Sequence, residues 1–355
     1  MPAHIIYYSK IFLIGETITM QKTTKFLCGA LAACFTFLPL SACDNGDGYT
    51  TIKLNEVTHS VFYAPMYLAE SLGYFEEEKI KIELTNGGGA DSVMSAVLSG
   101  DSDIGFCGPE AALYVLIGGS SDVPTVIGQL TKRDGSFLVS RKAEPNFKWE
   151  DLKGKEILAG RKGGVPAMTF EYVLGENGLK DGTDLTLNYD VAFNLMVSAF
   201  EAGTADYCTM FDPTAYEYEA AGKGYVVASV GEASGEVPYT CFIAKNSWIE
   251  KNEKTVEGFL RAITKAVKYV NETDSQTVAP HLKSYFEGTS EASIAASVER
   301  YRAIDAWRTE LTMKEASFNR LQDIIENAGE LSRRAQMSEL VDNSFASKVY
   351  NEIYK

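Results

Sequence analysis

Short apolar runs typical of β-strands recur along the chain from Thr51 and alternate with stretches of helical periodicity. This alternation is typical of parallel sheets covered by helices, and it predicts an α/β fold. The expected strands are 52–54, 80–84, 103–106, 125–128, 137–140, 156–159, 185–189, 207–210, 225–230 and 240–244.

The pattern changes after Ser247. Phe259, Ile263, Val267 and Val270 recur at the spacing of one helix face, and no run typical of a strand follows them. We therefore expect a helical C-terminal extension.

One pattern, SAxxxGxxD, occurs twice, at 95–103 and at 198–206. In each copy a helix is expected to end at the glycine, which tolerates the positive φ of a C-cap, and the aspartate opens a strand. A proline follows each strand, Pro109 in the first copy and Pro213 in the second, and is expected to start the next helix. Two similar lobes explain the pattern better than a chance resemblance between two common turns, which is the alternative.

Two lobes divide the chain at two crossings. We expect residues 51–133 and 240–355 in the first lobe and residues 137–239 in the second, with hinges near 131–136 and 237–241. Open α/β sheets bind ligands beyond the carboxyl ends of their strands, so two facing lobes are expected to enclose a cleft.

An apolar run at 26–40 follows Lys22 and Lys25 near the N-terminus. It has the length of the hydrophobic region of a secretion signal and is shorter than the ~20 residues of a membrane-spanning helix. A membrane anchor is the alternative, and Pro39 within the run argues against it.

The run ends in the sequence LSAC, which resembles the lipobox of bacterial lipoproteins. We therefore expect residues 1–42 to be a signal peptide, with Met20 as its true start. Cys43 is expected to carry the lipid, and the polar, glycine-containing segment 43–50 to tether the folded part to the membrane.

Composition excludes several classes of function. The 33 basic and 48 acidic residues give a net charge of −15, which repels nucleic acid, so no nucleic-acid partner is expected. Three histidines leave little material for a metal site, and neither a metal nor a cofactor is expected. Beyond Cys43 the chain has the odd set Cys107, Cys208 and Cys241, which we expect to be buried as small apolar side chains.

Several motifs together resemble one family. They are FYAPMYLAE at 62–70, LGYF at 72–75, GGGA at 87–90, LSG at 98–100 and DIG at 103–105. The set is similar to solute-binding proteins of ATP-driven importers, in the branch that includes alkanesulfonate, nitrate, riboflavin and thiamine-pyrimidine binders.

The resemblance covers residues 51 to 270 and implies a two-lobed periplasmic-binding-protein fold of type II. It also implies a small-molecule ligand, a membrane permease with its ATPase as partners, and no catalytic residue. Together with the lipobox it implies a monomer that is lipid-anchored on the extracytoplasmic face of the cell membrane.

The same branch includes eukaryotic enzymes that make the thiamine pyrimidine with an essential histidine, lysine-bound pyridoxal phosphate and a cysteine-rich tract. No run of adjacent cysteines occurs in this sequence. Such an enzyme is the second hypothesis.

Two glycine-containing turns are the first candidates for ligand contact. Gly88, Gly89 and Ala90 follow one expected strand, and Gly164 and Val165 follow another; each group precedes an expected helix. Free backbone N–H groups at a helix start favour an anion or a carbonyl group. Ordinary tight turns are the alternative.

Matching segments in the two copies of the repeat, 108–110 and 212–214, supply two acidic candidates. Gly108 and Glu110 follow the strand of the first copy, and Asp212 follows that of the second, so all three are expected at the cleft. Their alternative role is to cap or favour a helix N-terminus. Such carboxylates suit a ligand with N–H donors, such as an aminopyrimidine, better than a sulfonate.

Aromatic and polar side chains near the expected cleft complete the set. Phe62 and Tyr63 are candidates to stack on a planar ligand, with core packing as the alternative. His59 is a candidate hydrogen-bonding group, and a purely structural hydrogen bond is its alternative.

The remaining candidates lie near the crossings and in the second lobe. Arg133, in the first crossing, suits an anion clamp or a hinge salt bridge. Asn194 suits a helix cap or a ligand contact, and Tyr239 lies beside the second crossing.

Overall fold

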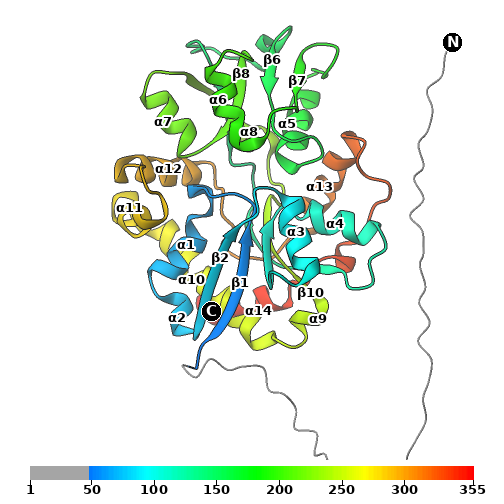
Figure 1. Cartoon of the computed structure of the whole chain (residues 1–355), viewed down its shortest axis with the longest axis vertical. Coiled ribbons are helices and arrows are strands. Elements are labelled where there is room, and N and C mark those ends of the chain that lie inside the picture. Colours follow the sequence, from blue (N-terminus) through cyan, green and yellow to red (C-terminus); the bar gives the residue numbers. More distant parts are fainter. Residues whose placement is uncertain (1–47) are drawn as a thin grey trace, which may run out of the picture. The chain divides into compact units, whose positions relative to one another are not determined.

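Two five-stranded sheets organise the chain, one above the other in Figure 1. The computed structural model describes residues 48–355, with only the backbone of residue 193. The signal peptide expected at 1–42, the lipid expected on Cys43 and most of the tether at 43–50 lie outside the described residues.

The first sheet contains the strands from both ends of the expected first lobe. They are β1 (Thr50–Glu56), β2 (Ile80–Asn86), β3 (Ile104–Cys107), β4 (Pro124–Thr131) and β10 (Thr240–Lys245). Their order is β2-β1-β3-β10-β4, and β10 runs antiparallel to both of its neighbours.

The second sheet repeats this plan with the intervening strands. They are β5 (Ser136–Ser140), β6 (Glu156–Leu158), β7 (Thr186–Asn188), β8 (Tyr207–Phe211) and β9 (Tyr225–Ser229). Their order is β7-β6-β8-β5-β9, and β5 is the strand that runs antiparallel to its neighbours. Each expected strand is present, and the predicted α/β class is confirmed.

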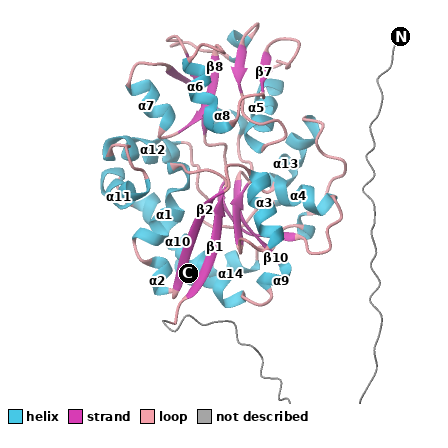
Figure 2. Ribbon diagram, viewed as in Figure 1, coloured by secondary structure: helices cyan, strands magenta, loops and turns pink. Residues whose placement is uncertain are grey.

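Helices cover both sheets (Figure 2). Around the first sheet lie α1 (Ala64–Ser71), α2 (Tyr74–Glu77), α3 (Ala90–Ser99), α4 (Glu110–Ile117), α9 (Asn246–Ile249), α10 (Glu253–Glu272) and α14 (Ser344–Tyr354). Around the second lie α5 (Val165–Glu176), α6 (Met196–Glu201), α7 (Thr214–Ala220) and α8 (Val230–Ser234). The C-terminal part adds α11 (Ser275–Leu282), α12 (Glu291–Ala303) and α13 (Glu315–Asn327). Short 3-10 turns are η1 (Val61–Tyr63), η2 (Trp149–Leu152), η3 (Phe193–Leu195), η4 (Lys283–Tyr285) and η5 (Met337–Glu339).

The two copies of the SAxxxGxxD repeat fold alike. Gly100 and Gly203 follow α3 and α6 with φ of 86° and 91°, conformations that glycine adopts without strain. The Asp103 carboxylate accepts a hydrogen bond from the Lys53 backbone N–H at 2.9 Å, and Asp206 accepts one from Glu156 N–H at 3.0 Å. Each aspartate thereby ties its turn to the neighbouring strand.

The apolar face expected in the C-terminal region belongs to α10, where Phe259, Ile263, Val267 and Val270 are fully buried. This helix packs against α1 and α14. The C-terminal helices also contact helices that cover the second sheet, because α12 contacts α7 and α13 contacts α5. None of the helices within residues 48–355 is long and apolar enough to cross a membrane.

The chain passes between the sheets through two segments that lie side by side. Val237 N–H donates to the Lys132 carbonyl at 2.9 Å, and Tyr239 N–H donates to the Thr131 carbonyl at 3.2 Å. A third stretch joins them, because Lys132 N–H donates to the Ala306 carbonyl at 2.8 Å. The C-terminal region thus braces the first crossing.

Candidate functional site

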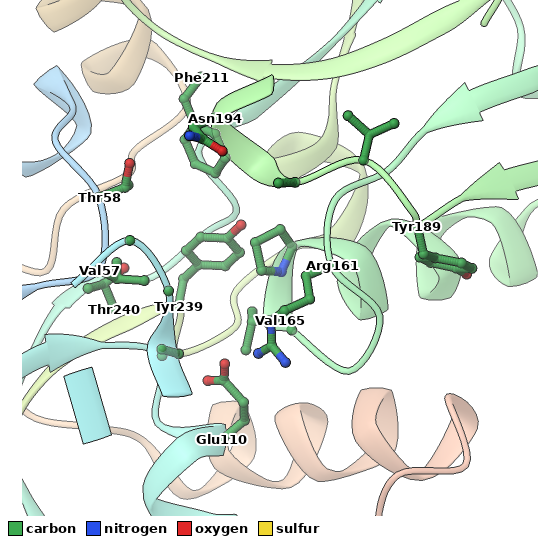
Figure 3. Close-up of a pocket in the computed structure, with 18 of the residues that line it drawn as sticks. Val57, Thr58, Glu110, Arg161, Val165, Tyr189, Asn194, Phe211, Tyr239 and Thr240 are labelled. Carbon is green, nitrogen blue, oxygen red and sulfur yellow. The ribbon is translucent and has the colours of Figure 1, made fainter. Parts of the chain in front are cut away.

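A cavity of about 350 Å³ opens where the carboxyl ends of the parallel strands of both sheets meet (Figure 3). Loops that follow β1, β2 and β3 line one side. Loops that follow β6 and β7, together with the last residue of β8, line the other. This is the place where open α/β sheets bind ligands.

The cavity gathers most of the residues expected from the sequence. Those that line it are Tyr63, Gly88, Gly89, Ala90, Gly108, Glu110, Gly164, Val165, Asn194 and Tyr239. They come from segments far apart in the chain, and both sheets contribute.

Three helices begin at the cavity. Ala90 is the first residue of α3, Glu110 of α4 and Val165 of α5, and all three line the cavity. No side chain caps these helices through the residue that precedes them. Their first N–H groups and their dipoles therefore favour negative groups at this end of the cavity, and Asp91 and Glu110 lie in the first turns of α3 and α4.

Glu110 is the buried acid of the site. Only 2% of its surface is exposed, and its Oε2 atom has no hydrogen-bond partner among the described residues. Burial raises the pKa of its carboxyl group to about 7, although backbone N–H groups of Glu110, Val165 and Ala111 and the Arg161 guanidinium oppose this rise. Figure 3 shows the Glu110 carboxyl and the Arg161 guanidinium facing each other.

Aromatic rings form another part of the lining. Tyr63, Phe211 and Tyr239 all border the cavity. The Tyr63 hydroxyl accepts a hydrogen bond from Thr240 Oγ1 at 3.3 Å, and the Phe211 and Tyr239 rings lie 6.3 Å apart. Burial raises the pKa of both tyrosines, so their hydroxyls stay neutral. Such a lining suits a planar, apolar ligand surface.

The loop after β7 lines the cavity on the side of the second sheet. It contributes Tyr189, Asp190, Val191, Ala192 and Asn194 to the lining. The Tyr189 hydroxyl donates a hydrogen bond to the carboxylate of Glu171, a residue of α5. This bond holds the Tyr189 side chain against α5.

Two contacts connect the opposite sides. The Arg161 guanidinium lies 2.9 Å from the Asp91 carboxylate, and the Tyr114 hydroxyl donates to the Gly163 carbonyl at 3.2 Å. The two halves therefore touch beside the cavity.

Two of the expected residues lie outside the lining, Phe62 in the packed core and Arg133, half-buried, in the first crossing. Phe62 is fully buried, its ring packs 4.9 Å from Tyr301, and its carbonyl accepts the Trp307 indole N–H at 2.8 Å. Phe62 also packs against Tyr63 and Tyr239, so it supports lining residues from behind. Arg133 lies in the first crossing, where its guanidinium donates to the Gly231 carbonyl at 3.4 Å.

His59 and Asp212 also lie outside the lining, because each is engaged elsewhere. His59 Nδ1 lies 2.7 Å from a Glu56 carboxylate oxygen, and its Nε2 lies 2.7 Å from the Tyr285 carbonyl. Burial alone lowers the pKa of His59, but its hydrogen bond and charge interaction with Glu56 raise it above the usual value.

The Asp212 side chain is fully buried beside α7. It accepts the Tyr216 N–H at 2.9 Å and lies 3.4 Å from the Arg300 guanidinium. The helix-capping alternative therefore describes Asp212 better than ligand contact does.

Sequence reasoning missed several lining residues. They are Val57, Thr58, Arg161, Pro166, Tyr189, Asp190, Val191, Ala192, Phe211 and Thr240. Most directly follow an expected strand, so their position at a carboxyl end is the signal that could have identified them. The loop after β7 has no glycine-rich or capping pattern that marks it.

The three cysteines Cys107, Cys208 and Cys241 are buried and free, as expected. Within residues 48–355, no group of three or more histidine, cysteine, aspartate or glutamate side chains could hold a metal ion.

Comparison with known proteins places the chain in a family. The profile of the NMT1/THI5-like family matches residues 61–276. The chain belongs to this family. It is 38% identical over 333 residues to the candidate binding protein YtlA of Bacillus subtilis (strain 168), which covers 94% of this chain and all of YtlA.

Two further comparisons bear on the fold and on the enzyme hypothesis. The alkanesulfonate-binding protein SsuA of Xanthomonas axonopodis pv. citri, solved bound to MOPS, has a TM-score of 0.66 and 19% identity. The match covers 82% of this chain and 98% of SsuA, and it shows a shared periplasmic-binding-protein fold. The 4-amino-5-hydroxymethyl-2-methylpyrimidine phosphate synthase of Aspergillus parasiticus is 25% identical over 221 residues, which cover 59% of this chain and 63% of the synthase.

Proposed function

We propose that this protein is the solute-binding component of an ATP-binding-cassette importer. It captures a small organic ligand in the cavity between its two lobes and delivers it, chemically unchanged, to a membrane permease and its ATPase. The observation that carries the proposal is the cavity at the carboxyl ends of both sets of strands, lined by residues of both sheets. The binding proteins YtlA and SsuA support it through sequence and fold.

The proposed location is the extracytoplasmic face of the cell membrane. The signal-like segment and the lipobox at Cys43 support export and a lipid anchor, and we propose that the anchored protein is a monomer. The lobes, 51–133 with 240–355 and 137–239, would close around the ligand by rotation at the hinges 131–136 and 237–241.

The favoured ligand is a nitrogen heterocycle such as a thiamine-type pyrimidine. The rings of Tyr63, Phe211 and Tyr239 offer planar surfaces, and the Glu110 carboxyl offers an acceptor for N–H groups. An alkanesulfonate or another small anion is the alternative, and Arg161 and the three helix starts favour it.

A pyridoxal-phosphate-dependent pyrimidine synthase is the second candidate, because the Aspergillus parasiticus synthase is a relative. The described cavity does not fit this cofactor: no lysine is among the residues that line it, so an internal Schiff base has no amine there. His59 also lies outside the lining. Purified protein without pyridoxal absorbance would dismiss the enzyme.

Native mass spectrometry of protein purified without denaturation tests the proposed function. We expect a bound small molecule that is released intact by acid or denaturant. A ligand-free protein that none of the ligand classes above stabilises would contradict the proposal.

A further inference from the structure

The carboxyl group of Glu110 lies folded back over the chain at the start of its own helix. A Cβ atom added to Gly108 would lie only 2.0 Å from Glu110 Oε2 and 2.7 Å from its Cδ. The absence of a side chain at residue 108 therefore lets the carboxyl occupy this place. With 2% of its surface exposed, Glu110 is held in the wall of the cavity and is not a mobile surface acid.

The Glu110 carboxyl occupies a position that would otherwise suit a bound anion. Backbone N–H groups at the start of α4, from Glu110 and Ala111, face the carboxyl, and so does the N–H of Val165 at the start of α5. Arg161 adds a positive charge from the same side as α5. Helix starts and a guanidinium are the groups that proteins use to hold oxyanions.

We propose that Glu110 determines the ligand specificity of the cavity by acting as a built-in anion. Its carboxylate takes the oxyanion position between the starts of α4 and α5, so the cavity rejects sulfonates and carboxylates and accepts ligands that donate N–H bonds to Oε2. This inference rests on the proposed function, since it names the class of solute that the same cavity takes.

Two observations make the acceptor role specific. Oε2 is a buried oxygen without a hydrogen-bond partner among the described residues, and it belongs to a residue that lines the cavity. A buried acceptor that stays unpaired costs free energy, and a ligand N–H placed there removes that cost. A sulfonate at the same place would set two negative groups side by side in a poorly hydrated site.

The charge of Glu110 changes near neutral pH, which gives the inference a signature. Burial places its pKa at about 7, so the exclusion of anions should weaken as the pH falls from 8 to 6. The Arg161 guanidinium, which faces Glu110, is paired with the Asp91 carboxylate at 2.9 Å. The other titratable groups that interact with Glu110 are Tyr63, Cys107, Tyr114, Tyr239 and Cys241, and burial raises the pKa of each, so all stay neutral.

The test uses the full folded domain and butanesulfonate as the anionic probe, with affinity measured by calorimetry at pH 8. Glu110→Gln keeps the shape of the side chain and removes its charge. Glu110→Ala removes the whole carboxyl group from the cavity wall. We expect both variants to bind butanesulfonate at least about tenfold more tightly than the wild type does. Glu217→Gln removes one carboxylate from the first turn of α7, outside the cavity, and should change nothing.

The pH series separates a charge effect from a change of shape. Wild-type affinity for butanesulfonate should rise about tenfold from pH 8 to pH 6, in proportion to the fraction of neutral Glu110, while Glu110→Gln should show no such rise. Thermal melts verify that each variant is folded, and the isosteric Glu110→Gln decides the outcome if Glu110→Ala does not fold.

Equal butanesulfonate affinity in the wild type and Glu110→Gln at pH 8 would overturn the role of Glu110. If the native mass spectrum still shows a retained solute, that failure leaves the proposed function standing. Loss of the proposed function would appear instead in the wild-type spectrum and melts, which do not depend on this variant.

Discussion

Arg161 and Asp91 form an ion pair of 2.9 Å that joins the turn after β6 to the first turn of α3. It connects the two sides of the cavity, yet both side chains are largely exposed, at 49% and 68%. Exposed pairs of this kind contribute at most about 1 kcal/mol. Such a contact positions the two halves without locking them, so the ligand must supply most of the free energy that favours the closed form.

Asp212 should be a residue of stability and not of affinity. Its buried carboxylate pairs with Arg300 and accepts the Tyr216 N–H, and it lies outside the cavity lining. We expect Asp212→Ala to lower the free energy of unfolding by about 1–3 kcal/mol in denaturant titrations. Ligand affinity, measured by calorimetry on the folded variant, should stay within about twofold of wild type. A variant of wild-type stability with weakened ligand binding would show instead that Asp212 contributes to the binding site.

The contrast between Asp212 and Glu110 shows what the sequence can and cannot predict. The repeat places both carboxyls in matching segments, Glu110 just after Pro109 and Asp212 just before Pro213, and it correctly predicts that a strand ends and a helix begins at each segment. The surroundings of the two carboxyls differ. Arg300, from α12, pairs with Asp212, whereas the carboxyl of Glu110 lies in the cavity wall. That helix is distant in sequence, so no local pattern reveals the pairing.

The rest of the molecule shows the same difference between features set by neighbouring residues and features set by tertiary contacts. Periodicity predicted the buried face of α10, and glycine positions predicted the turns at Gly100 and Gly203, because these features depend on neighbouring residues. The burial of Phe62 depends on Tyr301 and Trp307, and the lining role of the loop after β7 depends on the meeting of two sheets. Tertiary contacts decide such cases.

Asp134 should make stability depend on pH. It is fully buried, accepts two hydrogen bonds of 2.6 Å from Ser136, and burial raises its pKa from 3.8 to about 7. Between these values the folded state keeps a proton that the unfolded state has released, so the free energy of unfolding should fall as the pH rises from about 4 to about 7. Asp134→Asn should reduce this fall by on the order of 1 kcal/mol per pH unit in unfolding titrations. An unchanged pH profile would mean that Asp134 is ionised throughout.

Gly231 should not tolerate a methyl group. A Cβ atom there would lie 2.1 Å from the Asp134 backbone carbonyl oxygen, which the first crossing holds in place. We expect Gly231→Ala to destabilise the fold by about 1–3 kcal/mol. Gly175, inside α5, has no atom within 4 Å of its Cβ position, so the matched control Gly175→Ala should stabilise by about 0.5–1 kcal/mol. Equal melting temperatures for the two variants would contradict this account of the crossing.

Cys43 should carry the membrane anchor. It ends the signal-like segment, and two acyl chains suffice for stable attachment. We expect Cys43→Ser to leave the protein unprocessed or to release it into the medium, measured by fractionation and immunoblotting. Membrane attachment of the mature variant at the wild-type level would exclude lipidation at this residue.

Both lobes should close on the ligand, and solution scattering measures this closure directly. Protein stripped of its retained solute by denaturation and refolding should have a larger radius of gyration than the same protein after the solute is added back. The hinges at 131–136 and 237–241 should absorb the rotation, and the melting temperature should rise in parallel because the ligand binds only folded protein. A higher melting temperature with an unchanged radius of gyration would contradict capture by closure.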